Sequence, residues 1–499
     1  MSMITVENLT FSYPSGSETI FDHASFQIDT RWKLGLIGRN GRGKTTLFRL
    51  LQNEYEFSGS IASPVEFDYF PYPVTHPERT TEEVLLDLCS DAEWWKLIRE
   101  FHALEVSEEV LGRPFQTLSN GEQTKVLLAA LFIREGHFLL IDEPTNHLDA
   151  STRALVSSWL NTKSGYILVS HDRAFLDGCV DHILSLNRKT IEVQKGNFSS
   201  WFENFQRQQQ NENTQNERLK KEIRHLKKAK HQTENWSNQT EKSKNGTRNS
   251  GSKIDKGYVG HKAAKMMKRS KSMENRQNKA IEQKSGLLQN AEKAESLKLH
   301  PLEFRSDRLV SLSNVQVIYD GRPANAPVSF DLHRHERMVL EGRNGSGKSS
   351  LLKALMGNPT EITGNITIGS GLVISYVPQD ASFLKGSLSG FIRENDLDES
   401  LFKAILRKMD FERALFDQKM EGYSGGQKKK VLLVRSLCQS AHLYIWDEPL
   451  NYMDIYSRMQ IEQLIEEFDP TMILVEHDRT FTDHICTHSV SVEKAEERR

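Results

Sequence analysis

Short apolar runs of strand length recur in both halves of the chain, and several end directly at glycine-rich or acidic residues. Helical spacing of apolar positions follows the glycine-rich segments. Alternation of strands and helices predicts an α/β fold, with a largely parallel sheet covered by helices on both faces. The pattern predicts strands at 32–37, 137–141, 166–170, 338–341, 442–446 and 472–476, and helices at 45–51 and 349–356.

The first half of the chain is repeated in the second half. The segment GRNGRGKTT at 38–46 recurs as GRNGSGKSS at 342–350, and LSNGEQ at 118–123 recurs as YSGGQ at 423–427. The triplets DEP at 142–144 and HDR at 171–173 recur at 447–449 and 477–479. Four motifs in one order at nearly one spacing indicate a duplicated domain. The sequence therefore predicts two tandem P-loop domains, at 1–205 and 301–499.

The segment 206–300 between these domains is poor in apolar residues and basic. It holds 23 Lys and Arg against 10 Asp and Glu, a net charge of +13, whereas the rest of the chain carries −15. Apolar residues recur at helical spacing on both sides of a Gly, Ser and Asn-rich stretch at 243–260. This pattern predicts an α-helical hairpin linker with its tip in that stretch, and a disordered linker is the alternative. A helix of about 33 residues would reach about 50 Å, and its charge indicates a polyanionic partner.

Composition excludes several other classes of protein. The four cysteines form no CxxC pair, so neither a disulfide framework nor a zinc site is indicated, as expected in a cytoplasmic protein. The N-terminus has no pattern of a signal peptide. The longest apolar run, at 126–133, is far shorter than the ~20 residues that cross a bilayer, so we expect no channel in this chain.

The glycine loops fit the GxxxxGK[ST] pattern of phosphate-binding loops. Backbone N–H groups would hold phosphate oxygens, the lysines would neutralise their charge, and Thr45 and Ser349 would reach Mg²⁺. A glycine turn with a surface lysine is the alternative, and the second copy argues against it. The predicted ATP-binding residues of the two loops are Gly38, Asn40, Gly41, Gly43, Lys44, Thr45, Thr46, Gly342, Asn344, Gly345, Gly347, Lys348, Ser349 and Ser350.

Acidic residues follow two of the predicted strands, and a histidine ends the next strand in each half. Asp142 and Asp447 can orient Mg²⁺, and the glutamates that follow them can polarise the attacking water. Such an Asp-Glu pair alone is usually a solvated turn, and a lone histidine is usually structural. Because both features recur in register with the P-loops, we predict as catalytic residues Glu143, Glu448, His171 and His477.

Two serines stand at the start of predicted helices beside bare backbone. Such positions can bind phosphate, and the pattern favours this function over ordinary helix capping, which is the alternative. The predicted phosphate-binding residues are Ser119, Asn120, Gly121, Ser424, Gly425, Gly426 and Gln427.

P-loop, LSGGQ-like signature, strand-Asp-Glu and histidine together resemble the ATP-binding-cassette superfamily. The resemblance implies that each ATP lies between the P-loop of one domain and the signature of the other. Lys44 would then face 424–426, and Lys348 would face 119–121. It also implies that Tyr13 and Tyr319 stack on adenine and that Gln379 is the Q-loop glutamine. The metal-binding residues would be Thr45, Asp142, Ser349, Gln379 and Asp447.

Two cassettes, a basic linker and EPTNHLD at 143–149 resemble the ABC-F group. Within that group, GLIGRNGRGKTT at 35–46, the degenerate motif WDEPLNYMD at 446–454 and the long linker resemble the Lsa/Vga-type antibiotic-resistance proteins. That resemblance implies a cytoplasmic monomer that binds the 70S ribosome, contacting 23S rRNA and P-site tRNA. Its linker would enter the exit-tRNA site and protect against lincosamides, streptogramin A and pleuromutilins. The residues expected to contact the ribosome are Lys244, Arg248, Lys253, Lys256 and Tyr258.

Departures from the family pattern predict two unequal ATP sites. Tyr72 stands where the first Q-loop glutamine would be, Asn120 and Glu122 alter the first signature, and Tyr452-Met453 replaces His-Leu in the second cassette. A housekeeping ABC-F translation factor is the main alternative function. The ATPase subunit of a membrane transporter is disfavoured by Tyr72 and by the basic insert. A DNA ATPase of the structural-maintenance type would carry its coiled coil within a cassette. Here the predicted hairpin lies between the two cassettes, which disfavours that alternative.

Overall fold

The computed structural model describes residues 2–14, 19–89, 94–134, 136–146, 148–187, 191–244, 297–357 and 361–495. The side chains of 212, 213, 216, 220, 226, 227 and 229–244 lie outside this description. Contacts divide the chain into two compact units. One unit contains both cassettes (Met1–Trp201 and Ala294–Arg499), and the other is Phe202–Lys293. No helix within the described ranges is long and apolar enough to cross a membrane.

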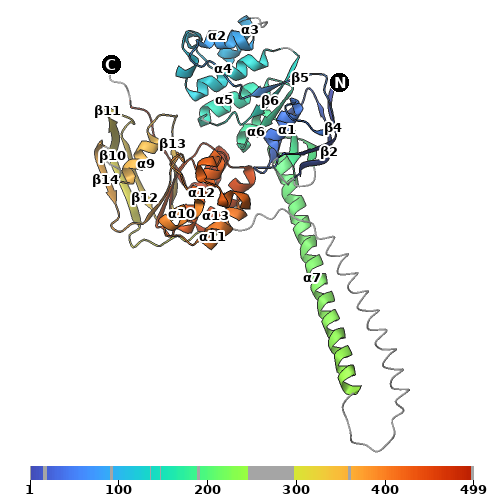
Figure 1. Ribbon diagram of the computed structural model, residues 1–499. Coiled ribbons are helices and arrows are strands. Elements are labelled where there is room, and N and C mark those ends of the chain that lie inside the picture. The colour runs from blue at the N-terminus through green and yellow to red at the C-terminus, as the bar shows by residue number, and fades with distance from the viewer. Residues whose placement is uncertain are drawn as a thin grey trace, which may run out of the picture. The chain divides into compact units, whose positions relative to one another are not determined.

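The first cassette contains a mostly parallel six-stranded sheet and a separate antiparallel sheet (Figure 1). The six-stranded sheet has the order β5-β6-β7-β3-β8-β9, and only β9 runs antiparallel to its neighbour. The antiparallel sheet has the order β2-β1-β4. The strands are β1 (Met3–Ser12), β2 (Thr19–Asp29), β3 (Lys33–Gly38), β4 (Ser58–Ala62), β5 (Glu66–Phe70), β6 (His137–Asp142), β7 (Tyr166–Val169), β8 (His182–Leu186) and β9 (Ile191–Lys195).

The second cassette repeats this plan. Its parallel sheet has the order β15-β16-β17-β13-β18, and an antiparallel sheet is built around β10. The strands are β10 (Arg308–Tyr319), β11 (Arg322–Pro323), β12 (Val328–His333), β13 (Arg337–Glu341), β14 (Glu361–Ile368), β15 (Ile374–Val377), β16 (Leu443–Asp447), β17 (Met472–Val475) and β18 (His488–Ser491).

Both faces of the parallel sheet are buried, and successive side chains on its central strands point alternately to one face and the other. In β16, Leu443 and Ile445 pack into the core shared with the antiparallel sheet and with α9 (Lys348–Leu355). Tyr444 and Trp446 point to the opposite face and pack against the helices there. A strand covered on both faces must be apolar throughout, and this explains why the sequence shows a continuous apolar run rather than an alternating one.

Helices of the two cassettes correspond in pairs. α1 (Lys44–Leu51) and α9 follow the glycine loops, and each packs between the two sheets of its cassette. The remaining helices are α2 (Thr81–Leu88), α3 (Trp94–Ala103), α4 (Asn120–Phe132), α5 (Ala150–Asn161) and α6 (Arg173–Cys179) in the first cassette, and α10 (Leu388–Glu394), α11 (Glu399–Lys408), α12 (Gly425–Cys438), α13 (Ile455–Phe468) and α14 (Arg479–Ile485) in the second.

The linker begins with one long helix, α7 (Phe198–Lys244). Its 47 residues span about 70 Å, so the helix is longer than the expected length of about 33 residues. It begins eight residues before the expected linker boundary at 206, and that boundary stays a prediction. The first turn was missed because it is fixed by the cassette. Phe198 and Trp201 are buried, and Ser199 N–H donates to Asp177 Oδ1 at 2.7 Å. The expected tip and returning helix, 245–296, lie outside the described residues.

The expected strands and P-loop helices are confirmed with boundaries within two residues. Both antiparallel sheets were missing from the sequence-based expectation. Their strands, such as β1 and β10, are bent by register shifts that break the alternation of apolar and polar positions.

Candidate functional site

Each P-loop holds its lysine inside the loop. In the first cassette Lys44 Nζ donates to Gly38 O at 2.7 Å, and in the second Lys348 Nζ donates to Gly342 O at 2.8 Å. Burial lowers the pKa of both ammonium groups, although nearby carboxylates oppose that shift. A buried ammonium group needs hydrogen-bond acceptors around it. The backbone carbonyl oxygens that accept from these lysines could therefore be replaced by phosphate oxygens when ATP binds.

Glycine is required at the last loop position before each lysine. Gly43 has a φ of 89°, and a Cβ built there would lie 2.6 Å from Ile20 Cγ2. Gly347, with a φ of 91°, is the second N-cap of this kind. This left-handed conformation leaves the first backbone N–H groups of each helix without a side-chain cap, as an anion site requires.

The ends of β6 and β16 place an aspartate beside each P-loop hydroxyl. Thr45 Oγ1 donates to Asp142 Oδ2 at 2.8 Å, and Tyr69 Oη donates to the same oxygen at 3.1 Å. In the second cassette both carboxylate oxygens of Asp447 are buried without a hydrogen-bond partner among the described residues. Burial raises the pKa of Asp447 to about 6.

Mg²⁺ fits this second position. Two buried, unpaired oxygens of Asp447 are costly unless a cation or an ordered water satisfies them. Ser349 Oγ lies 3.5 Å from Gln379 Oε1, which completes an all-oxygen group of the kind that Mg²⁺ prefers. Bound there, the cation would neutralise charge on the phosphates.

The glutamate after each aspartate turns into the space beside the P-loop. Glu143 and Glu448 both adopt positive φ, 51° and 48°, and their N–H groups donate to Val169 O and Val475 O at 2.9 and 2.8 Å. A strained backbone kept at the same place in both cassettes is typical of functional positions.

A histidine from the next strand faces each of these glutamates. His171 Nε2 lies 3.2 Å from Glu143 Oε1, and His477 Nε2 lies 3.7 Å from Glu448 Oε1. Burial raises the pKa of Glu143 to about 8 and lowers that of His477 to about 4. A neutral imidazole beside a carboxyl group can orient a water and share its proton, which fits the catalytic function predicted for all four residues.

The two cassettes together form two cavities. The first, of about 410 Å³, is lined by the P-loop and Glu143 of the first cassette and by the signature and Tyr452 of the second. The second, of about 790 Å³, is lined by the P-loop, Gln379 and Glu448 of the second cassette and by Ser119, Asn120 and Gly121 of the first. The structure thus brings each P-loop to the signature of the other cassette, as the family resemblance implied.

Both signature serines are helix N-caps in the structure. Ser119 Oγ accepts from Glu122 N–H at 3.2 Å, and Ser424 Oγ accepts from Gln427 N–H at 3.3 Å. The side chains of Glu122 and Gln427 at the third helical position in turn accept a hydrogen bond from the backbone N–H of the capping serine, which completes a capping box. Both serines thus act as helix caps in the structure, and their phosphate binding stays a prediction.

The two aromatic residues expected at adenine differ. Tyr319 is 45% exposed and lines the second cavity. Tyr13 instead packs edge-on against Phe11 and Tyr55, and its hydroxyl lies 2.9 Å from Thr46 Oγ1. Adenine stacking by either residue stays a prediction.

Several functional positions were missed although the repeat could have revealed them. Tyr69 and Tyr376 occupy equivalent places two residues before a proline. Tyr69 is hydrogen-bonded to Asp142, and Tyr376 is half-buried with its hydroxyl shielded from solvent near Asp447. Arg153 and Arg458, 305 residues apart, join the start of α5 and of α13 to Asp172 and Asp478 at 2.9 and 2.7 Å.

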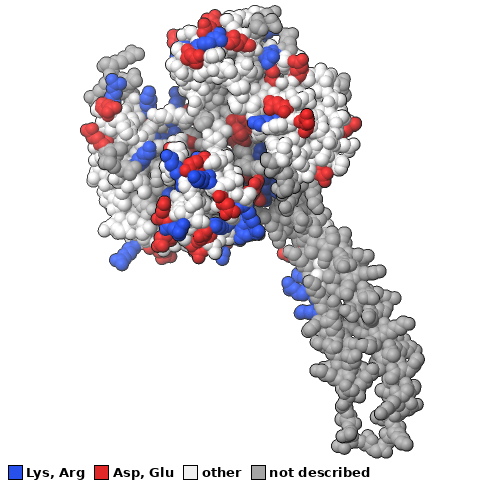
Figure 2. All heavy atoms as spheres, viewed as in Figure 1, with Lys and Arg blue, Asp and Glu red and all other residues white. Residues whose placement is uncertain are grey.

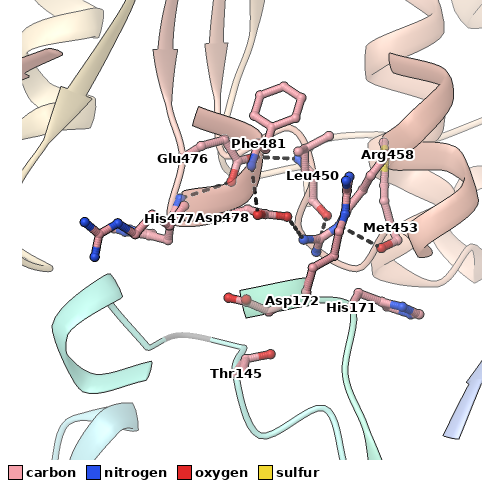
Figure 3. Close-up of polar contacts among 12 residues, drawn as sticks. Thr145, His171, Asp172, Leu450, Met453, Arg458, Glu476, His477, Asp478 and Phe481 are labelled. Atoms are coloured by element: carbon pink, nitrogen blue, oxygen red, sulfur yellow. Dashed lines mark hydrogen bonds and ion pairs between the residues drawn. The ribbon is translucent and has the colours of Figure 1, made fainter. Parts of the chain in front are cut away.

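Arg458 is the centre of a buried polar cluster (Figure 3). Its guanidinium donates to Asp478 Oδ2 and to the carbonyl oxygens of Leu450 and Met453. Glu476 Oε1 accepts from Leu450 N–H at 2.8 Å, and burial raises the pKa of Glu476 to about 7. The cluster fixes the segment between Glu448 and α13.

Arg458→Ala is expected to destabilise the protein by about 3–5 kcal/mol, since it leaves Asp478 buried without its partner. The midpoint of urea unfolding, followed by circular dichroism, measures the loss. Arg479→Ala is the control, because its pair with Asp483 is exposed and should contribute less than about 1 kcal/mol. Equal midpoints for the two variants would refute the importance of the cluster.

Lys348→Ala is expected to reduce ATP turnover more than its equivalent Lys44→Ala. Gln379 lines the second cavity, whereas Tyr72 is 37% exposed and is no part of the described lining of the first. We expect losses of about 100-fold and about tenfold in kcat, measured by phosphate release. Equal losses would show that the two sites contribute equally.

Comparisons with known proteins agree with this geometry. The sequence profile of the family described as ABC transporter matches residues 21–146 and 326–451, half of the chain. The chain is similar to YfmR of Bacillus subtilis, an uncharacterized ABC transporter ATP-binding protein (28% identity; 99% of this chain, 81% of YfmR). It is also similar to the ribosome protection protein VmlR of the same species (26%; 96% and 85%). A third relative is the energy-dependent translational throttle protein EttA of Haemophilus influenzae (26%; 91% and 86%).

A solved structure has the same fold across both cassettes. The archaeal ribosome recycling factor aABCE1, crystallised with the ribosomal stalk protein aP1, matches with a TM-score of 0.61 and 20% identity over 98% of this chain and 88% of its own. The chain therefore belongs to the ABC transporter family, as an ATPase with two cassettes of the ABC-F type.

Proposed function

We propose that this ABC-F ATPase binds the ribosome through its interdomain segment and protects the peptidyl-transferase centre from lincosamide, streptogramin A and pleuromutilin antibiotics. The segment would enter the exit-tRNA site and contact 23S rRNA and P-site tRNA. The observation that carries the proposal is α7, whose 47 residues are far more than a connection between two cassettes needs.

Charge supports an RNA partner for this segment. The excess of 13 positive charges lies within 206–300, whereas basic and acidic residues are interspersed on the cassette face of Figure 2. Lysines and arginines that neutralise phosphates release counterions, and they recognise folded RNA by its shape and backbone. The side chain of Lys244 and the residues Arg248, Lys253, Lys256 and Tyr258 lie outside the described part of the chain, so their contacts stay predictions.

The cassettes would set the lifetime of the ribosome-bound state. ATP held between a P-loop and the opposite signature favours closed cassettes, and closed cassettes would favour binding. Hydrolysis removes the γ-phosphate that both halves contact and would release the protein. Since one chain supplies both halves of both sites, we propose that it works as a monomer, in the cytoplasm where ribosomes are found.

A housekeeping translation factor is the second candidate, because EttA matches 91% of this chain. The two functions share their ATPase chemistry and differ in the effect on drug-treated cells. A transporter subunit is disfavoured, because Tyr72 stands where a coupling partner's Q-loop contact would lie.

The test is to express the chain in a drug-sensitive bacterium and to measure inhibitory concentrations of lincomycin and of a pleuromutilin. Ribosome pelleting of the same lysates measures association. Protection is expected to raise the inhibitory concentrations, and a variant without ATPase activity should not raise them. Ribosome binding without protection would favour the translation factor, and recovery with membranes alone would favour the transporter subunit.

A further inference from the structure

Helix α13 of the second cassette contacts the first cassette through two arginines. At its first turn the ring of Tyr456 lies under the guanidinium of Arg39, 5.2 Å from the ring centroid. Two turns further along, Glu462 forms an ion pair with Arg173, the first residue of α6. The Arg173 and Glu462 side chains are only 10% and 9% exposed, so this pair is shielded from solvent.

The equivalent helix of the first cassette lacks both groups. Positions eight residues after the capping aspartates Asp149 and Asp454 are Ser157 and Glu462, and positions two residues after them are Ser151 and Tyr456. Ser157 donates to Phe175 O within its own cassette. Arg479, the counterpart of Arg173, is 81% exposed and pairs with Asp483 on its own helix. The two cassettes therefore differ in these contacts because they carry different residue types at equivalent positions.

The two P-loops differ in the same sense. Arg39 also pairs with Asp410 of the second cassette. At the second site Arg343 and Glu105 are exposed, and no ion pair joins them in the described structure. The first cavity is correspondingly the smaller, about 410 against 790 Å³.

We propose that α13 keeps the first ATP site assembled while the cassettes separate at the second site. Arg39 belongs to the first P-loop, and Arg173 lies two residues after His171, which lines the first cavity. Helix α13 therefore contacts two segments that build that site. A buried ion pair opens reluctantly, because separation leaves two charges without their partners. At the second P-loop the exposed Arg343 forms no such buried ion pair with the first cassette within the described residues.

Nucleotide release from purified protein tests the proposal, and it depends on the ATPase alone and on no ribosomal function. In the Glu143→Gln/Glu448→Gln protein, which retains unhydrolysed nucleotide, bound fluorescent ATP is chased with excess ATP. We expect two phases of equal amplitude. Lys44→Ala should remove the slow phase, and Lys348→Ala should remove the fast one.

Glu462→Ser, which installs the residue of the first cassette, should accelerate the slow phase about tenfold or more and leave the fast phase unchanged. Glu466→Gln is the matched control, since Glu466 lies on the same helix and pairs with His484 of its own cassette. Tyr456→Ser should act in the same direction as Glu462→Ser.

The charge swap Arg173→Glu/Glu462→Arg restores an ion pair and should return release towards the slow rate, even if Glu462→Ser folds poorly. Conversely, Ser157→Glu gives the second site a partner for Arg479 and should slow the fast phase. A single release phase, a response to Glu462→Ser no larger than that to Glu466→Gln, or failure of the swap would each overturn the proposal.

Discussion

The Glu143→Gln/Glu448→Gln protein is expected to bind ATP and to hydrolyse it at least about 100-fold more slowly than the parent. Each glutamate follows the aspartate at the end of a central strand, turns inward with positive φ and faces a histidine, 3.2 Å away in one cassette and 3.7 Å in the other. Glutamine keeps the size of the side chain but cannot take a proton from water. Phosphate release and nucleotide retention on a filter measure the two properties.

This variant should also stay on ribosomes and inhibit growth, since the release step is blocked. Glu66→Gln is a suitable control, because Glu66 is exposed on the edge strand β5. Undiminished steady-state ATPase in the double variant would show that another group activates the water.

Removing 245–257 is expected to leave ATP hydrolysis nearly intact and to abolish antibiotic protection. α7 alone extends about 70 Å up to Lys244, so the deleted residues are far along the chain from either P-loop. They carry Arg248, Lys253 and Lys256, which we expect to meet phosphate. Susceptibility to lincomycin and to a pleuromutilin, measured beside phosphate release, checks both halves of the expectation.

Single substitutions divide the tip's contribution further. Removing one of these charges should weaken ribosome pelleting modestly and reduce its salt dependence, as lost phosphate contacts do. Tyr258→Ala should reduce protection with little change in binding, because an aromatic ring can stack on a base or lean on a tRNA end. Full protection by the deleted protein would reduce the segment to a connector and remove the proposed mechanism.

The sequence predicted those features whose physical cause is local. A strand buried on both faces is apolar throughout, and a phosphate loop needs glycine at 43 and 347. For this reason β3, β6, β13 and β16 and the P-loops were located within two residues. The start of α7 was missed because Phe198 and Trp201 are fixed by burial against the cassette rather than by the helical pattern of the linker.

Contacts between the cassettes were beyond the reach of pattern analysis. Arg173 and Glu462 are 289 residues apart, and no sequence motif near either residue indicates that the two form a pair. Comparing the two repeats position by position could have drawn attention to Glu462, because the first cassette has Ser157 there. Helix capping by Ser119 and Ser424 was not favoured by the sequence for a different reason. A serine with an acid or amide three residues later fits both helix capping and phosphate binding, and only coordinates show that capping is present.

The construction of each cavity from both repeats has a consequence for synthesis. Translation completes the first P-loop about 380 residues before its opposing signature at 424–426. At about 5–20 residues per second, the first domain waits many seconds for its partner. During that time the nascent chain can fold one cassette but can complete neither catalytic centre. A protein proposed to act on ribosomes therefore cannot hydrolyse ATP on the ribosome that makes it until its second cassette has emerged and folded.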